Sequence, residues 1–144
     1  MKSSMSSALI YGLIFAATGV SLPYAGLWFE SRGLSGSEIA VILAVPMLAR
    51  AVTGPMVAIW ADGFRLRRTA LAWLSLVAAL AYGACIYVEG FGLWLVLWLV
   101  ASTAASSLIP LSDAFTLKLA RREGFDFSIP RGVGSVSFIA ANVV

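Results

Sequence analysis

The sequence predicts an all-α, multi-pass helical membrane protein, and two features support this fold class. Hydrophobic residues make up 60% of the 144 residues and charged residues only 12%, whereas a soluble domain has about 25% charged residues. The apolar residues also form long blocks separated by short charged strings, as expected when helices cross a bilayer. We therefore expect four transmembrane helices and the start of a fifth, in a single incomplete transmembrane domain over residues 1–144.

Each expected helix is an apolar block bounded by polar or turn-forming residues. The blocks cover residues 7–29, 37–60, 69–88, 93–119 and 130–144. Ser35 or Ser37 is a suitable N-cap for the second helix, since a serine hydroxyl accepts a hydrogen bond from a free backbone N–H. The last block is shorter than the about 20 residues that a membrane-spanning helix needs. We therefore expect the chain to be an N-terminal fragment.

The distribution of basic residues predicts the orientation in the membrane. Arg32 is the one basic residue in the loops after the first and third helices. The other side carries Lys2, Arg65, Arg67, Arg68, Lys118, Arg121, Arg122 and Arg131. Because loops rich in Lys and Arg stay in the cytoplasm, we expect a cytoplasmic N-terminus and a location in the cell (inner) membrane. The same placement explains the net charge of +3 without nucleic-acid binding.

Several classes of enzyme and metalloprotein are disfavoured by residues that are rare or missing. The chain has no histidine and one cysteine, Cys85, so it offers neither a His-based catalytic group nor a Cys/His metal motif. There is also no nucleophile–base pair. We therefore expect neither an enzyme nor a bound metal or cofactor, and we interpret Cys85 as a small buried hydrophobe.

Two of the expected helices carry stripes of small or polar residues. In the third helix, the stripe consists of Ser75, Ala79 and Gly83. In the fourth, it consists of Ser102, Ser106, Pro110 and Asp113. Small residues at four-residue spacing allow another helix to approach closely, whereas a stripe ending in an acid is also typical of a face that lines a cavity. Both interpretations stay open at this point.

A charged residue lies midway along the second expected helix. Arg50 stands in VPMLARAVTGPM, ten residues before Trp60, which is about 15 Å along a helix. A guanidinium at this depth needs a partner or water. Arg50 is therefore a candidate for solute binding, with a structural tether to a neighbouring carbonyl or acid as the alternative.

The loop after the second helix, GPMVAIWADGFRLRRTA, resembles a motif of the major facilitator superfamily. Members of this superfamily carry Gly-x-x-x-Asp-Arg-x-Gly-Arg-Arg between their second and third helices. Asp62 matches the acid, and Arg67 and Arg68 match the basic end. The resemblance implies that these three residues form a loop that gates the cytoplasmic side. The alternative for Arg67 and Arg68 is a role in membrane topology alone.

The stretch PLSDAFTLKLARREGFDFSIPRGVGS is similar to the fourth-to-fifth-helix region of three groups within this superfamily. They are the oligosaccharide:proton symporters (the lactose-permease group), the phenylpropionate permeases and the nucleoside:proton symporters. The shared residues are Pro110, Asp113, Ala114, Phe115, Arg121, Arg122, Phe125, Asp126, Phe127, Arg131 and Gly134. The resemblance implies that Asp113 and Arg131 pair with each other and bind the substrate. The alternative is a salt bridge at a helix end.

These features together predict part of a secondary active transporter. It would move a small polar solute by alternating access, coupled to protons, with the first bundle of a twelve-helix protein in this chain and the C-terminal half elsewhere. Sugars, aromatic acids and nucleosides all remain open as substrates. The alternative is a small four-helix membrane protein that acts as an assembly or stabilising subunit and docks a partner through its small-residue faces.

Overall fold

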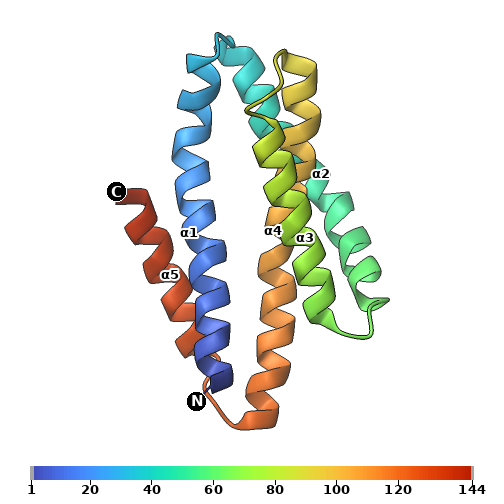
Figure 1. Cartoon of the computed structure of the whole chain (residues 1–144), viewed down its shortest axis with the longest axis vertical. Coiled ribbons are helices and arrows are strands. Elements are labelled where there is room, and N and C mark those ends of the chain that lie inside the picture. Colours follow the sequence, from blue (N-terminus) through green and yellow to red (C-terminus); the bar gives the residue numbers. More distant parts are fainter. Residues whose placement is uncertain (1, 144) are drawn as a thin grey trace. The chain divides into compact units, whose positions relative to one another are not determined.

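The structure, a computed structural model, describes residues 2–143 and is all-helical in this part, which confirms the all-α fold class. The helices are α1 (Lys2–Ser31), α2 (Gly36–Asp62), α3 (Arg67–Ala84), α4 (Phe91–Glu123) and α5 (Ser128–Val143) (Figure 1). The expected end of the last helix, Val144, lies outside the described residues. The chain after α4 turns at Gly124, whose φ of 71° suits a residue without a Cβ atom.

Among the described residues, three helices are long and apolar enough to cross a membrane. They are α1, through its apolar stretch Ser4–Ser21, together with α2 and α4. The apolar part of α3, Arg68–Ala84, is shorter because the helix ends at Ala84 and the chain then continues in turns. The structure therefore has helices that suit a multi-pass membrane protein, while the count of four spans and the start of a fifth stays a prediction.

The chain consists of two compact units, which we describe separately. Unit 1 contains Met1–Ala25 and Ile109–Val144, and unit 2 contains Gly26–Leu108. Unit 1 thus combines most of α1, the second half of α4 and all of α5. Unit 2 combines the end of α1, α2, α3 and the first half of α4.

Within unit 1, α1 and α5 pack closely and run in the same direction. The contacts of Gly12 are with Val133 and Ser137, and those of Gly19 are with Phe138 and later residues of α5. A Cβ atom on Gly19 would lie 2.8 Å from the carbonyl oxygen of Phe138. The glycines therefore allow the two backbones to approach, as small residues do between membrane helices.

Unit 2 has an apolar core at the end of α1 and the start of α4. Phe29, Ile42, Cys85 and Trp94 are buried together, and the Trp94 indole N–H donates a 3.1 Å hydrogen bond to the carbonyl oxygen of Cys85. Cys85 is a free cysteine, and its burial confirms its interpretation as a small hydrophobe. The α1 helix ends nearby at Ser31, and the chain turns at Gly33, whose φ is 87°.

Two local predictions in unit 2 had different outcomes. Ser35 caps α2, and it shares a capping box with Glu38, which confirms one of the two predicted N-caps. Among residues 2–143, nothing packs closely against the stripe of Ser75, Ala79 and Gly83: Ser75 and Ala79 are exposed, and a Cβ built on Gly83 would meet nothing within 4 Å outside the neighbouring backbone of α3. The buried residues of α3 lie on a neighbouring face, at Ala70, Leu74, Ala78 and Ala81.

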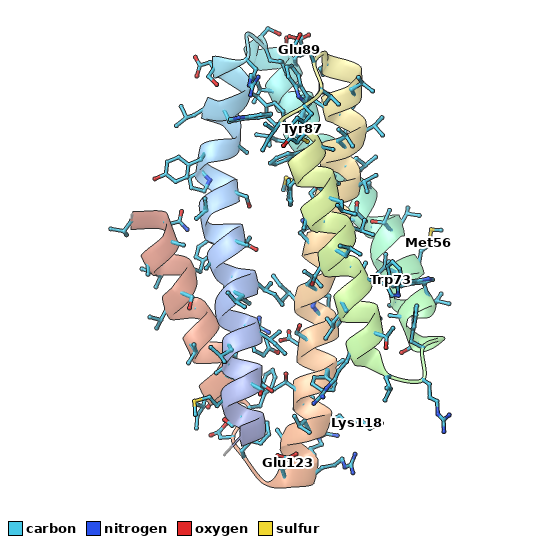
Figure 2. The ribbon with its side chains drawn as sticks, in the orientation of Figure 1. Met56, Trp73, Tyr87, Glu89, Lys118 and Glu123 are labelled. Carbon is cyan, nitrogen blue, oxygen red and sulfur yellow. The ribbon has the colours of Figure 1, made fainter. Side chains whose placement is uncertain are left out.

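Large apolar side chains cover the outside of unit 2. Met56 on α2 and Trp73 on α3, both labelled in Figure 2, are 62% and 52% exposed. Such exposed apolar surface is rare on soluble proteins, whereas it is expected of helices that face lipid or another part of a membrane protein.

Candidate functional site

The candidate site lies in unit 1, where α1, α4 and α5 each contribute one polar side chain. Asp113 comes from α4, three residues after Pro110, Tyr11 comes from α1, and Arg131 comes from the first turn of α5. Residues of α1 and α4 that lie 102 positions apart in the sequence are thus in direct contact. The site depends on the tertiary structure of unit 1 rather than on any one helix.

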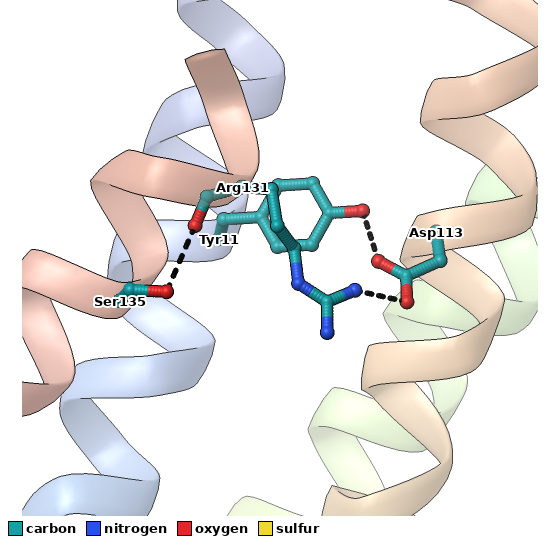
Figure 3. Close-up of polar contacts among 4 residues, drawn as sticks. All are labelled: Tyr11, Asp113, Arg131 and Ser135. Carbon is teal, nitrogen blue, oxygen red and sulfur yellow. Dashed lines mark hydrogen bonds and ion pairs between the residues drawn. The ribbon is translucent and has the colours of Figure 1, made fainter. Parts of the chain in front are cut away.

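Both carboxylate oxygens of Asp113 accept hydrogen bonds from this group (Figure 3). The Tyr11 hydroxyl donates to Oδ1 at 2.5 Å. The Arg131 guanidinium donates from Nη1 to Oδ2, which makes this contact a salt bridge as well as a hydrogen bond. A charge-assisted contact of this type is stronger than a hydrogen bond between neutral groups, so the three side chains hold one another in a defined arrangement.

Aromatic rings surround the charged pair. The guanidinium carbon of Arg131 lies 5.7 Å from the centroid of the Phe15 ring, within the range of a cation–π interaction. The Tyr11 ring contacts Phe15 and, edge to face, Phe127. The pair therefore combines charged groups with apolar ring surface, as expected of a small-molecule site.

The members of the site differ in how accessible they are. Tyr11 is fully buried, whereas the side chains of Arg131 and Asp113 keep 41% and 31% of their exposure. The salt bridge is thus partly open to the surface of the described structure, whereas Tyr11 is enclosed by its neighbours. Arg131 retains guanidinium N–H groups beyond the one that bonds Asp113, and these suit a carboxylate or a pair of hydroxyl groups.

Further polar side chains are buried around Tyr11 and Asp113. Ser7, Ser112 and Thr116 are each at most 2% exposed, and Thr116 lies beside the Tyr11 hydroxyl. The Ser112 hydroxyl has no hydrogen-bond partner within residues 2–143. The contact between α1 and α4 is therefore polar where Tyr11 meets Asp113 and Thr116.

Of the predicted substrate-binding residues, the structure brings Asp113 and Arg131 together. Arg50 belongs to unit 2, where it is exposed on α2 and has no hydrogen-bond or ion-pair partner among the described residues. The tether to a nearby acid or carbonyl is thus not formed within this part of the chain. A role of any of the three in substrate binding stays a prediction.

The predicted gating residues lie at the connection between α2 and α3 in unit 2. Asp62 is the last residue of α2, and Arg67 and Arg68 are the first two residues of α3. An acid at a helix C-terminus is unfavourable beside the negative end of the helix dipole, so a cation nearby stabilises it. Asp62 and Arg68 are exposed, and the side chain of Arg67 lies outside the described part of the structure.

The serines of the α4 stripe bond to the backbone of their own helix. The Ser102 hydroxyl donates to the carbonyl oxygen of Trp98, and the Ser106 hydroxyl donates to that of Thr103. Such bonds satisfy the hydroxyl groups without a neighbouring helix. The hydroxyl protons of these serines therefore need no acceptor across a helix interface, and among Ser102, Ser106 and Asp113 only Asp113 bonds to side chains of other helices within the described residues.

Sequence reasoning missed the importance of Tyr11. A tyrosine in an apolar helix is usually packed through its ring, and Tyr11 alone gives no reason to expect a polar contact. The available signal was the spacing of Ser4, Ser7 and Tyr11, which places three polar side chains on one face of α1. Asp113 stands at the end of the corresponding stripe on α4.

Comparison with known proteins identifies the family. The profile described as "MFS_1 like family" matches residues 5–144. The chain belongs to this family of the major facilitator superfamily. It is therefore part of a family of membrane transporters and not of an enzyme family, and the resemblance seen in the loop after α2 and in the α4–α5 region is confirmed.

Two curated relatives of this MFS_1-like chain are transporters by name. The maltose permease of Geobacillus stearothermophilus is 30% identical over 135 residues, which are 92% of this chain and 34% of that protein. The "Probable 3-phenylpropionic acid transporter" of Escherichia coli (strain K12) is 28% identical over 148 residues, covering 100% of this chain and 38% of that protein. No solved structure matches significantly. The chain thus spans about a third of the length of these relatives.

Proposed function

We propose that this MFS_1-like chain is the N-terminal part of a secondary active transporter that moves a small polar solute by alternating access. The observation that carries the proposal is the accessible salt bridge between Asp113 and Arg131, which joins α4 to α5 beside the Phe15 ring. Charged groups within apolar helices are costly and are usually functional. Family membership favours this role over an assembly subunit.

The solute would bind at this salt bridge, with Arg50 as a third candidate. The guanidinium of Arg131 binds oxygen atoms through a planar fork, and Asp113 accepts hydrogen bonds from hydroxyl groups. The names of the two relatives supply one sugar and one aromatic acid as candidate solutes. Both kinds of solute combine an oxygen-rich group with a ring.

Three further parts of the proposal concern the whole transporter. Coupling to protons is supported by the similarity to proton symporters in the α4–α5 region. Asp62, Arg67 and Arg68 would form the gate on the cytoplasmic side, where the motif of the superfamily lies. The remaining partner would be a C-terminal half that completes the site, since transporters of this type place the site between two bundles.

Uptake by the full-length gene product that contains this chain tests the proposal. Cells that lack their own uptake systems receive radiolabelled maltose, 3-phenylpropionate or uridine, with and without a protonophore. We expect Asp113→Asn and Arg131→Gln each to abolish uptake of the transported compound, because each removes one half of the salt bridge.

The protonophore should abolish uptake by the unmodified protein, and Asp62→Asn should reduce it.

Membrane levels, measured by immunoblotting, separate loss of binding from loss of protein. Arg122→Gln is the matched control, since Arg122 is an exposed arginine in the last turn of α4, and it should leave uptake within about twofold, as surface substitutions usually do. Uptake by Asp113→Asn at the level of the unmodified protein would refute the proposed site.

A further inference from the structure

We propose that Tyr11 is a positioning residue of the site, which fixes the Asp113 carboxylate and, through it, the Arg131 guanidinium. This inference rests on the proposed function for its effect on solute binding. Its structural basis is independent, because the contacts among the three side chains are present without any solute. Tyr11 itself is fully buried, so it acts through Asp113 rather than on the solute.

The geometry of the carboxylate gives the first step. The Tyr11 hydroxyl donates to Oδ1 at 2.5 Å, and the Arg131 guanidinium donates to Oδ2. Each oxygen of the Asp113 carboxylate thus has its own donor (Figure 3). The carboxylate torsion of an aspartate is broad and roughly two-fold when no contact restrains it. A donor on Oδ1 therefore determines where Oδ2 points.

The packing of Tyr11 gives the second step. Its ring contacts Phe15 and Phe127, and its Cβ atom lies 3.2 Å from the position that a Cβ on Gly134 would take. The phenol is thus held by α1 and α5 around it and cannot move freely away from Asp113. A rigid donor of this kind restrains its acceptor more than a flexible side chain would.

The position of Arg131 gives the third step. Its guanidinium contacts the Asp113 carboxylate and lies 5.7 Å from the centroid of the Phe15 ring. The Tyr11 hydroxyl also interacts with the guanidinium, while the side chain of Arg131 is 41% exposed, so Asp113 is its one charged partner in this group. Without the Tyr11 hydroxyl, the Asp113 carboxylate can rotate. The Arg131 guanidinium then lacks an acceptor in a fixed position, and it takes several orientations instead of one.

The reactivity of Arg131 toward phenylglyoxal tests this inference without a solute. The full-length protein is purified, treated with phenylglyoxal, and the modification of Arg131 is followed by mass spectrometry of its peptide, with Arg122 as an internal reference. In Tyr11→Phe, which keeps the ring and loses only the hydroxyl, we expect Arg131 to react about fivefold faster, the equivalent of one hydrogen bond. Asp113→Asn should also raise the rate.

Two controls separate positioning from general loosening of the protein. Tyr24→Phe removes a hydroxyl from the same helix, where Tyr24 is 44% exposed and has no hydrogen-bond partner within residues 2–143, and it should leave the rate unchanged. In the Asp113→Ala background, which leaves no side-chain acceptor for the Tyr11 hydroxyl at this position, Tyr11→Phe should raise the rate less than twofold, because its influence passes mainly through Asp113. An unchanged rate in Tyr11→Phe, or an equal increase in Tyr24→Phe, would overturn the inference.

Uptake kinetics give a second readout on whichever of maltose, 3-phenylpropionate and uridine is transported. We expect Tyr11→Phe to raise KM about fivefold and to change kcat less than twofold, since it weakens a binding group without removing it. An unchanged KM would overturn the inference. If Asp113→Asn retains uptake, the proposed function fails, and the Arg131 reactivity still decides the role of Tyr11.

Discussion

At the scale of single residues, the side chain of Asp126 organises the start of α5. Its carboxylate accepts hydrogen bonds from the Ser128 backbone N–H at 2.9 Å and from the Ser128 hydroxyl at 2.8 Å. These bonds, the backbone bond first, lower the pKa of Asp126 below its ordinary value. Asp126 thus caps the N-terminus of α5. Arg131 lies three residues after Ser128, so the cap directly precedes the helical turn that contains Arg131.

The lowered pKa predicts how the cap depends on pH. Because the folded state favours the ionised carboxylate, the contribution of the cap is fully present above the ordinary aspartate pKa of about 3.9 and is lost as the pH falls through the lowered value. Amide hydrogen exchange of Ser128 in nanodiscs measures this loss as a falling protection factor. Asp126→Asn, which accepts the same bonds and does not titrate, should remove the pH dependence. A constant protection factor in the unmodified protein would contradict the prediction.

The residues of the site also show what sequence reasoning supplies. The pairing of Asp113 with Arg131 followed from a resemblance that covers both positions, because a spacing of eighteen residues across a turn does not by itself bring two side chains together. Their positions along the helices alone suggest two separate charges near a membrane surface. The polar face that contains Tyr11 was a signal for a contact, but it does not determine which helix α1 meets, so Tyr11 could not be paired with Asp113.

At the scale of helices, the glycines of α1 determine how closely α5 packs. Gly19 lies against backbone and side-chain atoms of α5, whereas Gly26, on the same helix, has nothing within 4 Å of an added Cβ. The same substitution should therefore have opposite effects at the two positions. Whether a glycine-to-alanine substitution raises or lowers the stability therefore depends on what packs against the glycine, and not on helix propensity.

We expect Gly19→Ala to destabilise the protein and Gly26→Ala to be neutral or stabilising. In Gly19→Ala the new methyl group would lie 2.8 Å from the Phe138 carbonyl oxygen, and overpacking of this kind typically costs about 1–3 kcal/mol. In Gly26→Ala the gain in helix propensity is about 1 kcal/mol at most. The thermal unfolding midpoint of the purified full-length protein compares them, and equal midpoints would contradict the prediction.

The helices themselves were mostly readable from the apolar blocks, and the differences have local causes. The structure begins α1 at Lys2, because the serines before the apolar block continue the helix, and it extends α4 to Glu123, where Gly124 ends it. No described residue packs against the small-residue stripe on α3, so the close approach that it permits stays a prediction. Small residues permit a close approach, but they do not determine which face another helix uses.

At the scale of the whole molecule, the alternation of basic and acidic loops predicts the topology. Lys118 and Glu123 lie in the last turns of α4, and Tyr87 and Glu89 lie in the α3–α4 connection (Figure 2). The ends of α4 and α5 beside the α4–α5 connection carry Lys118, Arg121, Arg122 and Arg131, whereas the α3–α4 connection has no lysine or arginine. The bias should place the α4–α5 connection in the cytoplasm.

Fusions to reporter enzymes test this topology. Alkaline phosphatase joined after Gly90 should be active, because the α3–α4 connection would face the periplasm, whereas a fusion after Gly124 should be inactive. Green fluorescent protein at the same positions should give the opposite pattern. Phosphatase activity after Gly124 would contradict the prediction, and comparable expression of all fusions, checked by immunoblotting, is the control.

The contact between Asp113 and Arg131 would act as an internal competitor for any solute that binds there. When the site is empty, each group is the ligand of the other, so neither charge is left without a partner. A solute must replace these contacts, and its affinity is the difference between the bonds it forms and those it breaks. Such a difference keeps binding weak enough for release. A transporter must release its solute on the opposite side of the membrane. A salt bridge that re-forms as the solute leaves would favour this release.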